Sequence, residues 1–238
     1  QNSTYEQALK KAQDLGFAES DPTLDVTGKD SLNKLVILAT HGFGTIVKPE
    51  NVFSVGIDKL NAFDIQFAKE KGLKIKLIAQ ANKINGETFS LFVMPQLVSP
   101  NSYIYNVEDE YNGVVIEGEF YEKQYMFGKG AGGFPTGSSV LSDITARVHG
   151  YKYEYKKRTY FNRLEFTNDV VVKIYLRYKN VIDFEHFDFE TIDERYMSSH
   201  YNYVVGTISL ENLKRNQKLI GGLDVFVAFL GFPTRNSV

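Results

Sequence analysis

Hydrophobic positions along the chain change from a helical to a strand-like spacing after about residue 72. Before that point, apolar residues three and four apart predict helices at 3–15, 30–40 and 61–72. Ser3 and Glu6 have the spacing of a capping box, and Asn61 is a suitable N-cap for the third helix. Residues 35–39 are apolar on every side of their helix, which predicts that this helix is buried.

The period of two begins at residue 73. Residues 73–84 and 88–98 have the pattern of two paired strands, and Asn85-Gly86 between them is typical of a type I′ hairpin turn. One further long strand is predicted at 113–127. The pattern therefore predicts an α+β fold with a largely antiparallel sheet and helices on one face.

The second half of the chain is divided by a glycine-rich turn at 128–133 and a helix at 135–148. We place a first domain at 1–150, a connector at 151–168 and a small α+β unit at 169–238. Within that unit the pattern predicts strands or extended segments at 170–178, 183–190, 201–209 and 223–230, and a helix at 211–220.

Composition narrows the classes of function. Of 238 residues, 43% are hydrophobic, which is typical of a globular rather than a disordered protein. Cysteine is absent and the four histidines are scattered, so the sequence predicts neither disulfides nor a metal site. A net charge of −2 argues against nucleic acid as a partner, and no apolar run reaches the roughly 18 residues of a membrane span. We expect a cytoplasmic protein without a nucleic-acid or membrane partner.

Carboxylates gather in the segment 19–30, where four acids stand against one lysine. Asp30 and Lys34 are one helical turn apart and share a face. Spacing alone favours two structural interpretations. In these, Asp30 caps the helix, or Asp30 and Lys34 form an ordinary ion pair. Against them, Lys34 directly precedes the helix predicted to be buried, where a lysine is costly unless paired and becomes a candidate proton donor.

The glycine turn contains G-x-G-x-x-G at 128–133, and Glu154 follows at the distance of a ribose-binding acid. The preceding strand alternates apolar and charged residues, however, whereas the first strand of a dinucleotide-binding fold is buried on both faces. Only one helix follows before the connector. A tight turn that leads into a helix N-terminus is the alternative, and its free N–H groups could face an anion.

Residues 12–34 carry a longer pattern, A-x-x-x-G-[YF]-A-E-x-D-P-[TS]-x-D-[VI]-x-G-x-D-x-x-x-K, with every fixed position present. In this the chain closely resembles the homoserine dehydrogenase family. Further matches are Gly56-Ile57, Asn112 and the turn Gly130–Thr136, so the resemblance covers roughly residues 4–150. Lys129 departs from the family, where many members have proline.

The resemblance implies an oxidoreductase that uses NADP or NAD to interconvert L-aspartate 4-semialdehyde and L-homoserine, in threonine and methionine biosynthesis. It makes Lys34 the proton-transferring lysine and Asp30 the aspartate beside it. Glu19 and Asp25 hold the ammonium group of the substrate, with Asp21 in the same signature. Gly130, Gly132, Gly133 and Thr136 are expected to face the cofactor.

The family also has a nucleotide-binding domain ahead of this region, so the chain is expected to be an inactive catalytic-domain fragment of a longer polypeptide. One interpretation is that this longer polypeptide also contains an aspartate kinase. The resemblance implies a homodimer and an ACT-like regulatory unit at 169–238, although 183–190 does not fit the first ACT helix. The alternative is a non-catalytic regulatory or dimerisation module that retains the signature as scaffold.

Overall fold

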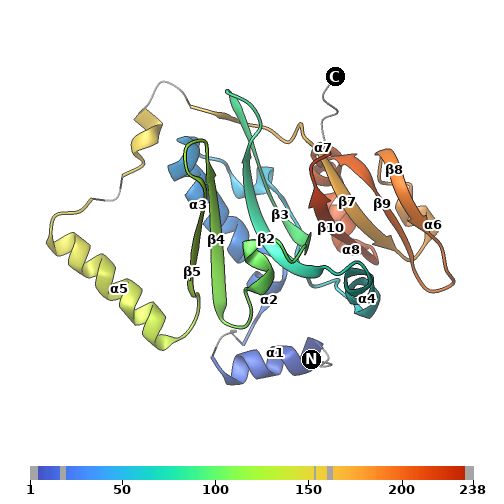
Figure 1. The fold of residues 1–238 in the computed structure, drawn as a ribbon, viewed down its shortest axis with the longest axis horizontal. Helices are drawn as coiled ribbons and strands as arrows, with labels where there is room; N and C mark the ends of the chain where they lie inside the picture. Colours follow the sequence, from blue (N-terminus) through green and yellow to red (C-terminus); the bar gives the residue numbers. More distant parts are fainter. Residues whose placement is uncertain (1–4, 17–19, 153, 160–162, 234–238) are drawn as a thin grey trace. The chain divides into compact units, whose positions relative to one another are not determined.

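An eight-stranded, mostly antiparallel sheet is the largest element of the computed structural model, which describes residues 5–16, 20–152, 154–159 and 163–233 (Figure 1). Two units are distinguished, one made of 1–23 with 99–154 and the other of 24–98 with 155–238. The first unit contains α1 (Tyr5–Asp14), the 3₁₀ turn η2 (Tyr103–Asn106), β4 (Tyr111–Gly118), β5 (Glu122–Lys129) and α5 (Gly133–Val148). The second unit contains the eight-stranded sheet.

The helices and 3₁₀ turns of the second unit are α2 (Thr23–Val26), α3 (Lys29–Phe43), η1 (Pro49–Asn51), α4 (Ala62–Glu70), η3 (Lys156–Thr159), α6 (Val181–Phe184), α7 (Leu210–Arg215) and α8 (Gln217–Gly222). Its strands are β1 (Phe53–Ser54), β2 (Lys74–Lys83), β3 (Thr88–Val98), β6 (Glu165–Phe166), β7 (Val171–Tyr178), β8 (Phe189–Tyr196), β9 (Asn202–Ser209) and β10 (Val225–Gly231). They pair in the order β1-β3-β10-β7-β9-β8, and β2 and β6 also pair with β3. The predicted α+β class with a mostly antiparallel sheet is confirmed.

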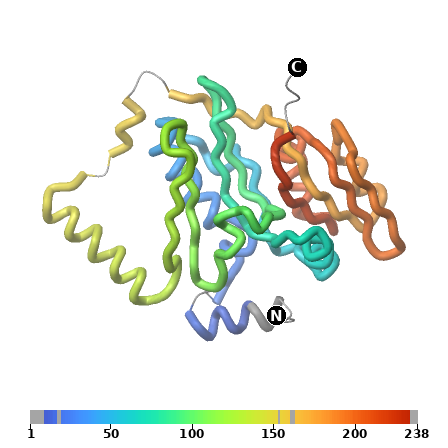
Figure 2. Tube along the Cα trace, viewed as in Figure 1, coloured from blue at the N-terminus to red at the C-terminus, as the bar shows by residue number. Residues whose placement is uncertain are grey.

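The predicted hairpin is present, with β2 and β3 antiparallel from Lys74↔Val98 to Lys83↔Phe89 (Figure 2). The predicted type I′ turn is wrong, because neither Asn85 nor Gly86 has the positive φ that this turn requires. Instead, the side-chain oxygen of Asn85 accepts hydrogen bonds from the backbone N–H groups of Glu87 and Thr88, both at 2.8 Å. An asparagine side chain thus closes the loop in place of the left-handed backbone.

Two other expectations for the strands are corrected. The single strand predicted at 113–127 is a hairpin, β4 and β5, which reverses between Gly118 and Glu122. The extended segment predicted at 183–190 begins with the helical turn α6, in which the side chain of Asn180 donates to the Asp183 carboxylate at 3.1 Å, and β8 starts only at Phe189. At α6 a local polar contact decides the structure, and the apolar pattern does not record it.

The helices begin and end mostly where the sequence indicates. The side-chain oxygen of Asn61 accepts hydrogen bonds from the backbone N–H groups of Phe63 and Asp64. The Asp64 carboxylate in turn accepts a hydrogen bond from the N–H of Asn61, so α4 opens with a capping box. Gly16 and Gly72 follow α1 and α4 with φ of 72° and 68°, the left-handed conformation that ends a helix. The capping box predicted at Ser3 lies outside the described residues.

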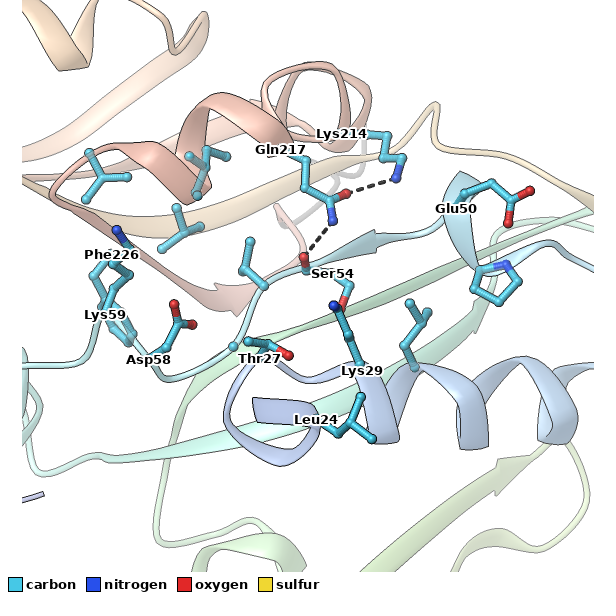
Figure 3. Close-up of a pocket in the computed structure, with 18 of the residues that line it drawn as sticks. Leu24, Thr27, Lys29, Glu50, Ser54, Asp58, Lys59, Lys214, Gln217 and Phe226 are labelled. Carbon is cyan, nitrogen blue, oxygen red and sulfur yellow. Dashed lines mark hydrogen bonds between the residues drawn. The ribbon is translucent and has the colours of Figure 1, made fainter. Parts of the chain in front are cut away.

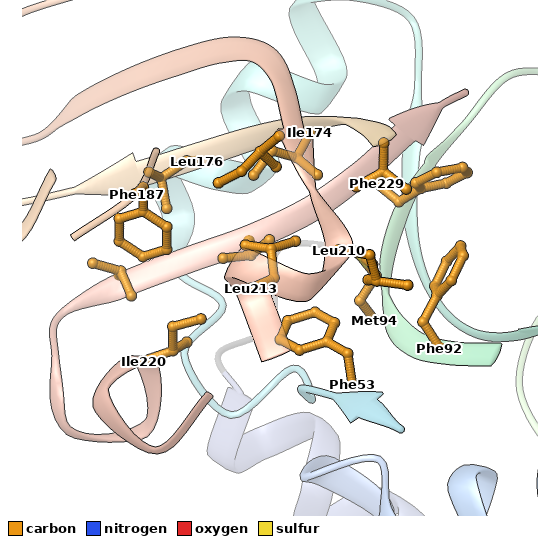
Figure 4. Close-up of a cluster of buried hydrophobic side chains, with 14 of the residues drawn as sticks. Phe53, Phe92, Met94, Ile174, Leu176, Phe187, Leu210, Leu213, Ile220 and Phe229 are labelled. Atoms are coloured by element: carbon orange, nitrogen blue, oxygen red, sulfur yellow. The ribbon is translucent and has the colours of Figure 1, made fainter. Parts of the chain in front are cut away.

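Strand β3 is covered on both faces. Alternate residues on one face, including Phe89, Leu91 and Val93, pack with Leu32, Leu35 and Ala39 of α3. Phe92 and Met94 on the other face join the cluster of α7 and α8, with Leu210, Leu213 and Ile220 (Figure 4). Because β3 pairs with both β2 and β10, it joins the hairpin and the C-terminal strands into one sheet.

Residues 171–231 form a β-α-β-β-α-β unit in which the first and last strands, β7 and β10, are neighbours and β9 lies between β7 and β8. The helix expected at 211–220 is divided into α7 and α8 at Asn216. Of the described helices, none is long and apolar enough to cross a membrane.

A buried ion pair joins this unit to α4. The guanidinium Nε of Arg177 on β7 lies 2.9 Å from the carboxylate of Asp64, and both side chains are fully buried. Arg177 also donates to Asp224 at 2.9 Å and to the carbonyl oxygen of Lys59 at 2.8 Å. Burial raises the pKa of Asp64, and the charge of Arg177 opposes that rise.

We expect Arg177→Ala to lower the free energy of unfolding by about 3–5 kcal/mol, because it leaves the Asp64 carboxylate buried without its counter-charge. Urea unfolding followed by circular dichroism measures the loss. Arg195→Ala is the matched control, since among the described residues the Arg195 side chain makes only a stacking contact with Phe184. Its loss should cost about 1 kcal/mol or less. Equal losses in the two variants would contradict a special role for the buried pair.

Candidate functional site

The start of α3 is fixed by two glycines. Gly28, the N-cap, has φ of 78°, and a Cβ there would lie 3.2 Å from Val93. Gly56 lies so close to the preceding loop that a Cβ would stand 1.8 Å from the carbonyl oxygen of Val26. The N–H of Ile57 donates to that same oxygen at 2.7 Å. The loop before α3 therefore rests directly on the backbone of the segment after β1.

Asp30 and Lys34 form an ion pair on α3, with 2.7 Å between the carboxylate and the ammonium. Their side chains are 41% and 63% exposed, so the expectation that Lys34 is buried is wrong. One face of the helix buries Leu32, Leu35 and Ala39. Ile37 and Leu38 are exposed, so the helix is covered on one side only. The pair is thus solvent-accessible, with both charged groups available to a ligand.

The other predicted acids are distributed over both units. Asp25 lies on α2, is exposed, and belongs with Asp30 and Lys34 to the unit of 24–98 and 155–238. Asp21 belongs to the other unit, and its carboxylate accepts from the N–H of Thr23 at 3.1 Å. The hydrogen bond from the Thr23 hydroxyl is the main reason that the pKa of Asp21 is lowered. Glu19 lies outside the described residues.

The glycine turn belongs to the first unit. A Cβ on Gly130 would lie 1.8 Å from the side-chain amide of Asn112, so the glycine leaves room for that side chain. Gly132, with φ of 112°, is the N-cap of α5 and supplies no side-chain cap. Open space surrounds the Cβ position of Gly133, and Thr136 is exposed. The start of α5 therefore presents free backbone N–H groups.

Lys129 has a structural role in the glycine turn. Its ammonium lies 2.8 Å from the carboxylate of Glu110 and over the ring of Tyr111. The hydrogen bond from Lys129 lowers the pKa of Glu110. Lys129 thus ties the end of β5 to the residue before β4, where the N–H of Gly130 also donates to the carbonyl oxygen of Glu110.

A cavity of about 570 Å³ in the second unit was not predicted from the sequence (Figure 3). The helix start, the segment around β1 and the helices α7 and α8 surround it. Lys29 and Asn33 of α3 line this cavity, whereas Asp30 and Lys34 do not. No short-range pattern could indicate this cavity, because its wall joins residues about 160 positions apart. No group of three or more potential metal ligands is found in the described part of the chain.

Comparison with known proteins assigns the signature and the turn to one family. The family model for homoserine dehydrogenase matches residues 1–145, more than half of the chain. The chain belongs to the homoserine dehydrogenase family. The match includes Asp25, Asp30 and Lys34 as well as the glycine turn.

Curated homoserine dehydrogenases show the same relationship. The enzyme of Bacillus subtilis is 42% identical over 146 residues, which are 61% of this chain and 34% of that protein. That of Synechocystis is 40% identical over 147 residues, which again are 34% of its length. The chain therefore matches about a third of the length of these oxidoreductases.

Solved homoserine dehydrogenases extend the likeness into the C-terminal unit. The Thiobacillus denitrificans structure has a TM-score of 0.72 and 25% identity, and covers 97% of this chain and 59% of its own. A Staphylococcus aureus structure has a TM-score of 0.63 and 28% identity, with 96% and 58% covered. A hyperthermophilic archaeal homoserine dehydrogenase in complex with NADPH has a TM-score of 0.50 and 26% identity, and covers 63% and 42%. The first two of these structures thus contain regions that correspond to nearly all of this chain.

Gly56→Ala should destabilise the fold by about 1–3 kcal/mol or more, because the new methyl group collides with the backbone of the loop that leads to α3. Gly42→Ala is the control within α3, where no atom lies within 4 Å of the new Cβ. That change should be neutral or stabilising by up to about 1 kcal/mol. Urea unfolding of both variants measures the difference, and a neutral Gly56→Ala would refute the close contact.

Proposed function

We propose that this chain is the catalytic part of an NAD(P)-dependent homoserine dehydrogenase, which interconverts L-aspartate 4-semialdehyde and L-homoserine in the route to threonine and methionine. The observation that carries the proposal is the ion pair of Asp30 and Lys34, which lies inside the family match and is open to solvent. A substrate with an ammonium group and a reducible aldehyde needs nearby carboxylates and a proton donor.

In this proposal the Lys34 ammonium gives a proton to the aldehyde oxygen as that oxygen becomes the hydroxyl of homoserine. In the reverse direction the neutral amine takes the proton back. Asp30 holds the lysine in one orientation, by a pair worth only about 0.3–0.5 kcal/mol on an exposed helix, so the substrate can displace it at little cost. Asp25, with Asp21 and Glu19 of the same signature, would bind the ammonium group of the substrate.

The residues of the glycine turn fit contact with a nicotinamide cofactor. Free N–H groups at the start of α5, the open space at Gly133 and the exposed Thr136 offer a surface that a polar cofactor group can approach. The cofactor in its reduced form, NADPH or NADH, would supply the hydride for aldehyde reduction, and NADP or NAD would take it back in the reverse direction. Gly130 serves packing against Asn112, so we assign cofactor contact to the backbone after Gly132.

The C-terminal residues 169–238 are proposed as an ACT-like regulatory unit. Their β-α-β-β-α-β order, with the first and last strands adjacent, supports this assignment. The alternative proposal for the whole chain, a non-catalytic regulatory or dimerisation module, keeps the same fold but assigns no proton transfer to Lys34. Activity of a Lys34 variant separates the two.

Lys34→Ala should lower kcat by about 10²–10⁴, the usual contribution of a general acid, in a polypeptide that joins this chain to the family's nucleotide-binding domain. Unfolding stability should change by less than about 1 kcal/mol, because the lost pair is exposed. Steady-state reduction of aspartate semialdehyde provides the measurement, with Lys83→Ala as the exposed-lysine control. A variant with near-normal kcat would favour the non-catalytic module.

The chain by itself should show no turnover and no binding of NADH or NADPH tighter than about 1 mM, because a turn and one helix start cannot fix a nicotinamide near the substrate. Calorimetry and an absorbance assay test the two parts. Circular dichroism serves as the control that the sample is folded. Measurable turnover would show that the described residues already hold the cofactor.

We further propose that the chain forms a homodimer through its sheet. Strand β2 pairs only with β3 in the described part of the chain, which leaves its other edge open, and Ile78 lies outside the three clusters of buried side chains. Sedimentation at micromolar concentration should give a dimer, whose mass is twice the 27.0 kDa of the chain. A monomer at that concentration would disprove the contact.

A further inference from the structure

The cavity between α3 and the C-terminal helices is a second place where a small molecule can bind. Apolar side chains, among them Leu24, Val55 and Phe226, form much of its wall. Its volume of about 570 Å³ is within the range of small-molecule sites. Asp30 and Lys34 are not part of its lining, so the cavity is separate from the proposed catalytic pair.

One wall is held in place by hydrogen bonds between distant segments. The Lys214 ammonium donates to the carbonyl oxygen of Val52 at 3.0 Å and to the side chain of Gln217 at 2.9 Å. Gln217 in turn donates to the carbonyl oxygen of Ser54 at 2.8 Å. Burial lowers the pKa of Lys214, an effect that nearby Glu50 opposes. These contacts keep α7 and α8 against β1 and define a preformed space.

The opposite wall carries charged side chains that have no polar partner in the described part of the chain. The Lys29 ammonium and the Asp58 carboxylate have no hydrogen bond or ion pair with any described residue, and Figure 3 shows both on the side facing Lys214 and Gln217. The hydroxyl of Ser54, also in the lining, is buried without a hydrogen-bond partner. Lys29, Asp58 and the Ser54 hydroxyl thus stand beside an apolar surface, and the lining also includes Glu50, Lys59 and Lys214.

We propose that this cavity binds a small zwitterion with an aliphatic body, whose carboxylate pairs with Lys29 and whose ammonium pairs with Asp58. A simple anion would have the carboxylates of Asp58 and Glu50 beside its charge. A simple cation would have the lysines of the lining beside it, so a zwitterion suits the set of groups best. The apolar wall accepts the aliphatic part. This site is independent of the proposed catalytic function.

Three probes of matched size test the charge requirement: L-valine carries both charges, isovalerate only the carboxylate and isobutylamine only the ammonium. Saturation-transfer NMR with the 238-residue chain should show saturable binding of L-valine below about 10 mM, and binding at least about tenfold weaker for the other two. Absence of saturable L-valine binding would overturn the proposal. Equal binding of isovalerate or isobutylamine would overturn it as well.

Variants locate the binding. Gly221→Leu fills the cavity from α8, where no atom lies within 4 Å of the new Cβ, and should abolish binding. Gly222→Leu, the matched control, has the same open surroundings but does not line the cavity, and should bind normally.

Charge variants complete the test. Lys29→Met and Asp58→Asn should each weaken the binding of L-valine at least about tenfold. The control changes Lys83→Met and Asp169→Asn should leave that binding unchanged. Circular dichroism and thermal unfolding confirm that all six variants fold. Binding that survives Gly221→Leu, or that Lys29→Met and Asp58→Asn do not weaken, would overturn the assignment to this cavity.

Discussion

The buried contact of Arg177 with Asp64 is the interaction on which the larger unit depends. A guanidinium without solvent exposure must find partners for its N–H groups, and it finds them on α4, before β10 and in the loop at Lys59. Tyr175 adds a hydroxyl that donates to Asp64 at 3.0 Å. Because an unpaired buried charge is far more costly than a paired one, these segments have one favourable arrangement.

That arrangement has consequences for the candidate site. The segment 52–60 is held at one end by β3, where the N–H of Val55 donates a hydrogen bond to the carbonyl oxygen of Val93. At the other end, the guanidinium of Arg177 donates a hydrogen bond to the carbonyl oxygen of Lys59. Gly56 lies between these two anchors, in contact with the loop that opens α3. The position of Asp30 and Lys34 is therefore linked, through backbone contacts, to strands more than a hundred residues later in the chain.

Local signals made much of this fold predictable. Alternation over 73–98 identified β2 and β3, and Asn61 marked the start of α4, because caps and strand periods act over a few residues. Arg177 and Asp64 are 113 positions apart, so no short-range pattern could pair them. The exposure of Lys34 was missed for a related reason: an apolar run shows how hydrophobic a helix is, but the sheet that it meets decides which side is covered.

The same helix shows how stability and chemistry can be separated. Leu32, Leu35 and Ala39 secure α3 to the sheet, and Gly28 and Gly56 set its starting point. The ion pair of Asp30 and Lys34 contributes little to that framework, since an exposed pair is worth a few tenths of a kcal/mol. In the proposed function, Lys34 is a proton donor that has to leave Asp30 when the substrate arrives. A weak pair on a strongly anchored helix permits this motion while the position of the backbone stays fixed, which is the combination that the proposed proton transfer requires.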